Sequence, residues 1–163
     1  MNEATKHFFE KFYLQQVHTD DYVDWAIACL EDGYDSKNLR ILAATEKFAY
    51  TYEFEEKFRR ALLELEWKFP SEKETLEKYV KDLARAIITD KLNPAEGCHK
   101  IYKTVVFLDY PKELSNWIYL DEGLEPETYE TLWDEYSYFD GSKDKWFEAI
   151  IREAKKLTET NFS

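Results

Sequence analysis

The chain has 163 residues, 34 of them acidic and 22 basic, which gives a formal net charge of −12. Its length suits one domain, and its composition of 44% hydrophobic and 34% charged residues with only four glycines and four prolines excludes a disordered or fibrous protein. Because phosphate binding requires clustered lysine and arginine, the acidic balance also argues against nucleic acid as a ligand.

Helical periodicity dominates the chain, so we expect one compact all-α domain, residues 1–163, with about seven or eight helices and no sheet. No apolar run reaches the roughly 18 residues of a membrane span, and the N-terminal segment MNEATKHFFEKFY lacks the pattern of a secretory signal. We therefore expect a cytoplasmic protein without a membrane partner. Cys29 and Cys98 are isolated and lack CxxC spacing, which predicts two buried thiols rather than a disulfide framework or a zinc site.

Residues 4–17 predict a first helix, with Thr19, Asp20 or Asp21 as the N-cap of the next one. Residues 20–44 then predict a buried helix, a corner at Gly33 and a second buried helix that Asp35 or Ser36 can cap. Apolar side chains cover these two helices so widely that little polar surface remains. We expect the other helices to pack around this pair and to bury five side chains almost fully: Trp25, Ile27, Leu30, Leu39 and Leu42.

The segment 52–69 predicts an amphipathic helix. Its solvent-exposed face carries acid–base pairs four residues apart, Glu55/Arg59, Glu56/Arg60 and Glu64/Lys68. Two later helix starts are well specified: Ser71 with Glu74 makes a capping box, and Asn93-Pro94 is a cap followed by proline. Gly97 lies inside the helix that Pro94 opens, which predicts another backbone packed close against it.

Glycine and proline also mark the limits of the remaining expected helices. The residues 104–108 (TVVFL) are β-branched, but we expect them to be helical because no second strand is evident. The other expected helices run from Pro111 to near Gly123, between Pro126 and Gly141, and over 146–157, with 158–163 frayed.

Candidate chemistry is limited. Glu96 and His99 make one E-x-x-H on a single helix face, but di-iron bundles need two such motifs and two further glutamates, so we expect no metal and no cofactor. The signatures of serine hydrolases, P-loops and zinc proteases are absent, and we assign no catalytic residue. We expect Arg40 to pair with Asp35 at the helix corner. Arg40, Glu96 and His99 are nevertheless the polar candidates for a pocket between helices.

Charge is concentrated late in the chain, where ten acids between Asp109 and Asp140 stand against one base, Lys112. Residues 117–140, here called the acidic aromatic segment, also hold more rings than helical spacing can bury, so some should reach solvent. Carboxylates attract a basic protein at long range, and exposed rings supply apolar contact area. The candidate binding residues are Tyr129, Tyr138, Phe139, Glu127, Glu130 and Asp134. The alternatives are a solvated acidic face, or a structural lid if the rings are buried.

The run WAIACLEDGYDSKNLRILAA, residues 25–44, resembles a pattern found in small bacterial proteins of unassigned function, W-A-x3-L-x2-G-x-D-S-x2-L-R-I-L-A. Segments similar to EKFRRALLELEWKFP (56–70) and NPAEGCHKIYK (93–103) follow in the same order in those proteins. The resemblance extends over residues 25–103. It implies a bacterial, cytoplasmic, helical protein in which residues 35–40 form a structural corner, and it implies no activity.

Two classes of function remain. The first is a protein–protein interaction module, such as an acidic immunity or antitoxin-like inhibitor of a basic partner, or a module that self-associates. The abundance of tyrosine, tryptophan and phenylalanine, 28 residues in all, favours it because tyrosine and tryptophan are enriched at interfaces. The second is an enzyme or small-ligand binder with a pocket between helices. A deep pocket around Arg40, Glu96 and His99 would favour the second class, and exposed rings on an acidic surface would favour the first.

Overall fold

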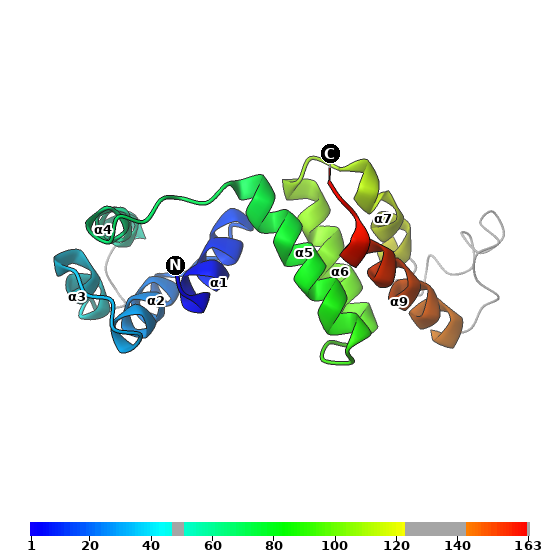
Figure 1. Cartoon of the computed structure of the whole chain (residues 1–163), viewed down its shortest axis with the longest axis horizontal. Helices are drawn as coiled ribbons and strands as arrows, with labels where there is room; N and C mark the ends of the chain where they lie inside the picture. Colours follow the sequence, from blue (N-terminus) through cyan, green and yellow to red (C-terminus); the bar gives the residue numbers. More distant parts are fainter. Residues whose placement is uncertain (47–50, 123–142, 163) are drawn as a thin grey trace. The chain divides into compact units, whose positions relative to one another are not determined.

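The computed structural model describes residues 1–46, 51–122 and 143–162. In these ranges the chain is helical and contains no strand, which confirms the predicted all-α class (Figure 1). Eight α-helices and one 3-10 turn are described: α1 (Glu3–Tyr13), α2 (Thr19–Glu31), α3 (Lys37–Ala43), α4 (Thr51–Glu64), α5 (Glu72–Ile88), α6 (Pro94–Phe107), η1 (Lys112–Leu114), α7 (Ser115–Glu122) and α9 (Lys143–Glu159). None of these helices combines the length and the apolar composition that a membrane span requires.

The chain divides into two compact units, Met1–Thr75 and Leu76–Ser163. Each unit contains a hydrophobic core, and the core of the second unit includes no residue of α2 or α3. The expectation that all the helices pack around the 20–44 pair is therefore wrong, because that pair supplies only the core of the first unit. One domain spanning 1–163 stays a prediction.

The core of the first unit is built from α1, α2, α3 and α4, whose apolar faces meet on aromatic side chains. The ring of Phe58 lies 4.4 Å from that of Phe8 and 4.7 Å from that of Trp25, measured between centroids. Edge-on and tilted contacts of this kind add stability beyond the burial of apolar area. The buried members are Phe8, Phe9, Tyr22, Val23, Trp25, Ala26, Cys29, Leu39, Leu42, Phe54, Phe58, Ala61 and Leu62.

Burial on α2 and α3 matches the prediction only in part. Trp25 is 3% exposed, and Leu39 and Leu42 are fully buried. Leu30 is only partly buried, and Ile27 is 41% exposed, so the prediction for Ile27 is wrong. The neighbouring helices cover the side of α2 that carries Ala26 and Cys29, whereas Ile27 falls on the opposite side, at helical spacing from Asp20, Asp24 and Glu31.

The start of α3 joins it to α4. Ser36 is the N-cap, as predicted, and its hydroxyl accepts a hydrogen bond from the Leu39 N–H at 3.2 Å. The carboxylate of Glu64, the last residue of α4, accepts hydrogen bonds from the backbone N–H of Asn38 at 2.8 Å and from its side chain at 2.5 Å. A carboxylate at a helix N-terminus satisfies otherwise unpaired N–H groups. Glu64 therefore ties α4 to α3.

Three predicted helix boundaries in this unit are wrong. The first helix, predicted over 4–17, ends at Tyr13. The N-cap of α2 is His18 rather than Thr19, Asp20 or Asp21, and the Asp21 carboxylate accepts a hydrogen bond from the His18 N–H at 2.7 Å. The helix predicted over 52–69 ends at Glu64. The acid–base pairs Glu55/Arg59 and Glu56/Arg60 form as expected, at 2.6 and 2.5 Å.

Five helices end in the same way, with a residue at positive φ directly after the C-cap. Gly33 is the expected case, at φ +86°, but Gln15, Glu66, Asp90 and Asp109 adopt φ between +54° and +58° without being glycine. After each of these residues the next N–H reaches back to a carbonyl in the last turn, as from Gln16 to Lys11 at 2.9 Å. This hydrogen bond satisfies a terminal carbonyl and reverses the chain.

The second unit contains α5, α6, η1, α7 and α9, and α6, α7 and α9 pack against one another (Figure 1). Asn93 caps α6, with Pro94 at its first position, as predicted, and α6 continues helically through 104–107. The buried core residues of the second unit are Val80, Ala84, Ile87, Cys98, Ile101, Val105, Leu114, Trp117, Leu120, Trp146, Ala149, Ile150, Ala154 and Leu157. The indole N–H of Trp146 donates to the Leu120 carbonyl at 3.0 Å, which fixes α9 against the end of α7.

Gly97 is explained by close packing, although a side chain rather than a backbone approaches it. A Cβ atom at this position would lie 2.6 Å from Cγ1 and Cδ1 of Ile87 and 3.1 Å from Leu92. The two distances to Ile87 are shorter than real Cβ contacts, and the distance to Leu92 is tighter than most. Glycine at position 97 therefore lets α6 approach the end of α5 closely.

Candidate functional site

The proposed binding residues of the acidic aromatic segment lie outside the described residues. This applies to Tyr129, Tyr138, Phe139, Glu127, Glu130 and Asp134, so their role stays a prediction. The described start of the segment has the expected mixture of buried and exposed side chains: Trp117 and Leu120 are 1% and 6% exposed, and Tyr119 between them is 58% exposed. At least one ring of the segment therefore reaches solvent.

Arg40 forms the predicted helix-corner pair. Its Nε lies 3.3 Å from the Asp35 carboxylate, and both side chains are more than half exposed. Exposed pairs of this kind contribute little to stability because water screens them. Arg40 belongs to the first unit, whereas Glu96 and His99 lie on α6 of the second, so the pocket that would combine them stays a prediction.

His99 is held by a buried carboxylate. Its Nδ1 lies 3.1 and 3.2 Å from the two carboxylate oxygens of Asp121 on α7, and Asp121 is only 9% exposed. Glu96, one turn earlier on α6, instead pairs with Lys100 at 2.6 Å. Burial of a carboxylate is costly unless it is paired, and His99 supplies one such partner.

The contact with Asp121 also determines what His99 can do chemically. Because an ionised carboxylate only accepts hydrogen bonds, its two oxygens on Nδ1 favour the neutral ring with its proton on that atom, which leaves the lone pair of Nε2 as an acceptor. The side chain of His99 is 48% exposed. The same orientation of imidazole by carboxylate occurs in catalytic histidines and in metal-binding histidines. Among the residues that the structure describes, however, no group of three or more histidine, cysteine, aspartate or glutamate side chains could hold a metal ion.

Both cysteines are free and buried, as predicted. Burial raises the pKa of the Cys29 thiol, and burial together with the nearby Asp121 raises the pKa of the Cys98 thiol. Because the thiolate is the reactive form, a raised pKa makes both side chains poor nucleophiles and poor metal ligands. Their positions in the cores indicate structural roles.

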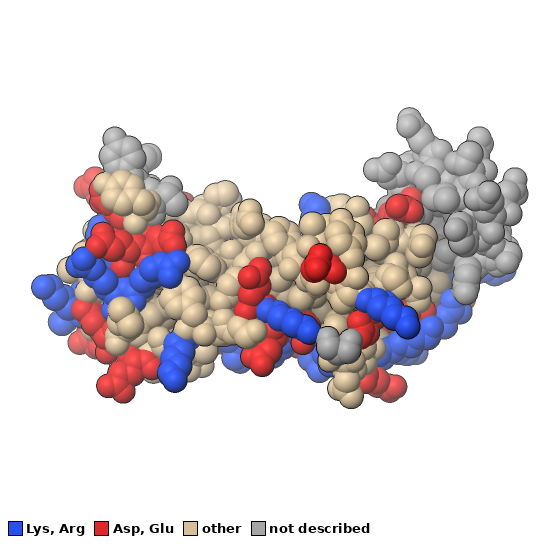
Figure 2. All heavy atoms as spheres, turned by 90° about the horizontal axis from the view of Figure 1, so that it is seen from above, with Lys and Arg blue, Asp and Glu red and all other residues tan. Residues whose placement is uncertain are grey.

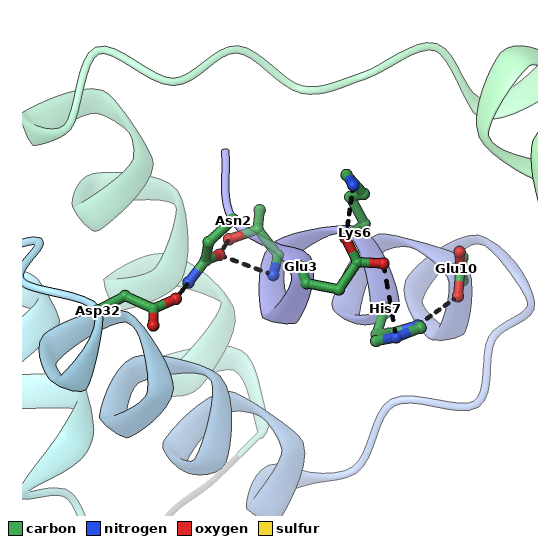
Figure 3. A network of polar contacts seen from close by, with 7 residues as sticks. Asn2, Glu3, Lys6, His7, Glu10 and Asp32 are labelled. Atoms are coloured by element: carbon green, nitrogen blue, oxygen red, sulfur yellow. Dashed lines mark hydrogen bonds and ion pairs between the residues drawn. The ribbon is translucent and has the colours of Figure 1, made fainter.

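A second polar cluster lies at the start of α1 (Figure 3). The Asn2 side chain accepts hydrogen bonds from the N–H and the hydroxyl of Thr5 at 3.0 and 2.5 Å, and donates one to the Asp32 carboxylate at 2.6 Å. The Thr5 hydroxyl in turn accepts the indole N–H of Trp25 at 3.0 Å. The Asn2–Asp32 and Thr5–Trp25 hydrogen bonds link the start of α1 to α2 and its C-cap, so we interpret the cluster as a connection between these two helices.

On the exposed side of the same helix, His7 lies between two glutamates. Its Nδ1 is 2.9 Å from the Glu10 carboxylate and its Nε2 is 3.9 Å from that of Glu3, which also binds Lys6 (Figure 3). The His7 side chain is 66% exposed. Water screens contacts this exposed, so they favour the helix only slightly.

The distribution of charge separates residues 123–142 from the rest of the second unit. The other residues of that unit, 76–122 and 143–163, contain twelve acidic and twelve basic residues, whereas 123–142 contains six acidic residues and no basic one. On the face drawn in Figure 2, basic and acidic side chains lie interspersed over the described surface. Half of the net charge of −12 therefore falls within twenty consecutive residues.

Comparisons with protein-family models, with curated proteins and with solved structures gave no match.

Sequence reasoning identified His99 but missed its partner. Asp121 lies 22 positions further along the chain, on a different helix, and is one of the ten acids between Asp109 and Asp140. No local spacing links the two residues, since they meet only where α6 packs against α7. The signal that could have found Asp121 is its place beside Leu120 near the end of a predicted apolar helix, where a carboxylate needs a partner.

Proposed function

We propose that this protein is an interaction module that binds a basic protein through the acidic aromatic segment, residues 117–140. The observation that carries the proposal is the uncompensated charge of 123–142, next to described parts of the unit whose charges balance. Such a local excess speeds the encounter with a cationic partner. The exposed ring of Tyr119 supports the second element of the proposal, apolar contact area beside the carboxylates.

The proposal extends to the setting and the kind of partner. An acidic inhibitor of the immunity or antitoxin type would act in a bacterial cytoplasm, the setting that the sequence resemblance implies. Such an inhibitor covers a basic surface of its target enzyme and needs no catalytic group of its own. Self-association through the aromatic part of the segment is the competing outcome.

The test compares two variants that lose three charges each. Glu127→Gln/Glu130→Gln/Asp134→Gln removes charge from the segment, and Asp24→Asn/Glu31→Gln/Glu46→Gln removes the same charge from exposed positions of the first unit. Proteins retained by the wild-type chain from the native host are identified by mass spectrometry, and the purified partner is then measured by surface plasmon resonance at several salt concentrations. We expect the segment variant to lower the association rate constant about tenfold and to flatten its salt dependence. Equal effects of the two variants would contradict the proposal.

The aromatic part is tested separately with Tyr129→Ala/Tyr138→Ala/Phe139→Ala. We expect faster dissociation of the partner with a nearly unchanged melting temperature, because residues that only contact a partner contribute little to folding. A large drop in melting temperature would instead identify the rings as core and the segment as a structural lid. Sedimentation velocity of the wild-type chain alone separates a basic partner from a second copy.

A ligand-binding or enzymatic role centred on His99 is the second candidate, and the contact with Asp121 favours it. This role requires the neutral ring to carry its proton on Nδ1 and to leave Nε2 free to accept one. Nitrogen-15 NMR of the imidazole distinguishes the two neutral forms directly. We expect the Nδ1-protonated form in the wild-type chain and a mixture in Asp121→Asn, with Asp109→Asn as the exposed control. An Nε2-protonated ring in the wild-type chain would exclude this role.

A further inference from the structure

We draw no further inference here: the strongest candidate, the exposed face of α2 that carries Asp20, Asp24 and Glu31 around Ile27, is a cluster of carboxylates with nothing in the described residues to show what covers it.

Discussion

The two units build their cores from different side chains. Among the described residues, six of the thirteen buried core members of the first unit are aromatic, against two of fourteen in the second. The helices of the first unit are 7 to 14 residues long, apart from the start of α5, and each ring in its core buries a large apolar area. The second unit contains α9 and most of α5, each 17 residues long, and fills its core mainly with aliphatic side chains. The two cores thus have nearly the same number of buried members, but the first fills its interior largely with rings and the second mainly with aliphatic side chains.

The largest expected effect comes from removing a ring that many others touch. Phe58 is fully buried and contacts the rings of Phe8, Tyr22 and Trp25. Phe58→Ala should lower the free energy of unfolding of the first unit by about 3–5 kcal/mol through lost burial and a cavity. Urea unfolding measures the loss, and Leu63→Ala, at a position 76% exposed, is the control and should change stability by less than about 0.5 kcal/mol.

The same variant tests whether the two cores are independent. Hydrogen exchange followed by mass spectrometry should show faster exchange in α1, α2 and α4 and unchanged protection in α6 and α9. Equal loss of protection in both units would contradict independent cores and would support the single cooperative domain expected from chain length.

An intermediate effect is expected in the second unit at Gly97. Gly97→Ala places a methyl group against Ile87, and overpacking of this kind costs about 1–3 kcal/mol, partly offset by the roughly 0.5–1 kcal/mol that alanine gains over glycine in a helix. Ile87→Ala removes both atoms that collide, Cγ1 and Cδ1. A double-mutant cycle should therefore show the pair Ile87→Ala/Gly97→Ala to lose less stability than the sum of the two single changes. Additive values would show that Ile87 does not determine the need for glycine.

The smallest effect concerns Glu64, which is solvent-exposed. The backbone N–H of Asn38, followed by the Ser36 hydroxyl, lowers the pKa of this carboxyl group in the folded protein. A carboxylate with a lowered folded-state pKa stabilises the fold above its ordinary pKa of about 4.3, and this contribution is lost as pH falls through the folded-state value. Glu64→Gln should thus lower stability slightly at neutral pH, and the difference from wild type should shrink below about pH 4.

Unfolding curves at several pH values measure this effect, with Glu31→Gln as an exposed control on α2. A wild-type advantage that grows toward acid pH would contradict the assigned hydrogen bonds.

Local sequence signals predicted much of the fold. Asn93-Pro94, Ser36 and Gly33 each determine a helix end through their own backbone and side chain, and all three act as predicted. Signals that depend on distant packing failed. Periodicity does not determine which side of a widely apolar helix such as α2 is covered, which is why the prediction for Ile27 is wrong. No local signal indicates that two cores form instead of one.

Prediction from local sequence was less successful for the candidate site, because that site depends on contacts between helices. His99 was recognised by its chemistry, but Asp121 became its partner only through the packing of α6 on α7. Apolar spacing continues past Glu64 and predicts a helix that ends at Phe69, whereas α4 ends at Glu64 and Glu66 adopts positive φ. Neither the partner nor this turn has a signature within a few residues of sequence.

The left-handed residues that follow four of the helices are positions where the stability of the fold could be raised by substitution. Gln15, Glu66, Asp90 and Asp109 hold a conformation that costs an L-residue roughly 1–2 kcal/mol. Glycine adopts it without strain, and the entropy that glycine loses on folding offsets roughly 0.5–1 kcal/mol of the gain. All four residues are exposed and lie outside both cores, so replacing them with glycine would relieve backbone strain without changing core packing. Glycine at these four turns is a direct route to a more heat-resistant version of the protein, on which variants of the acidic aromatic segment could be studied without loss of the fold.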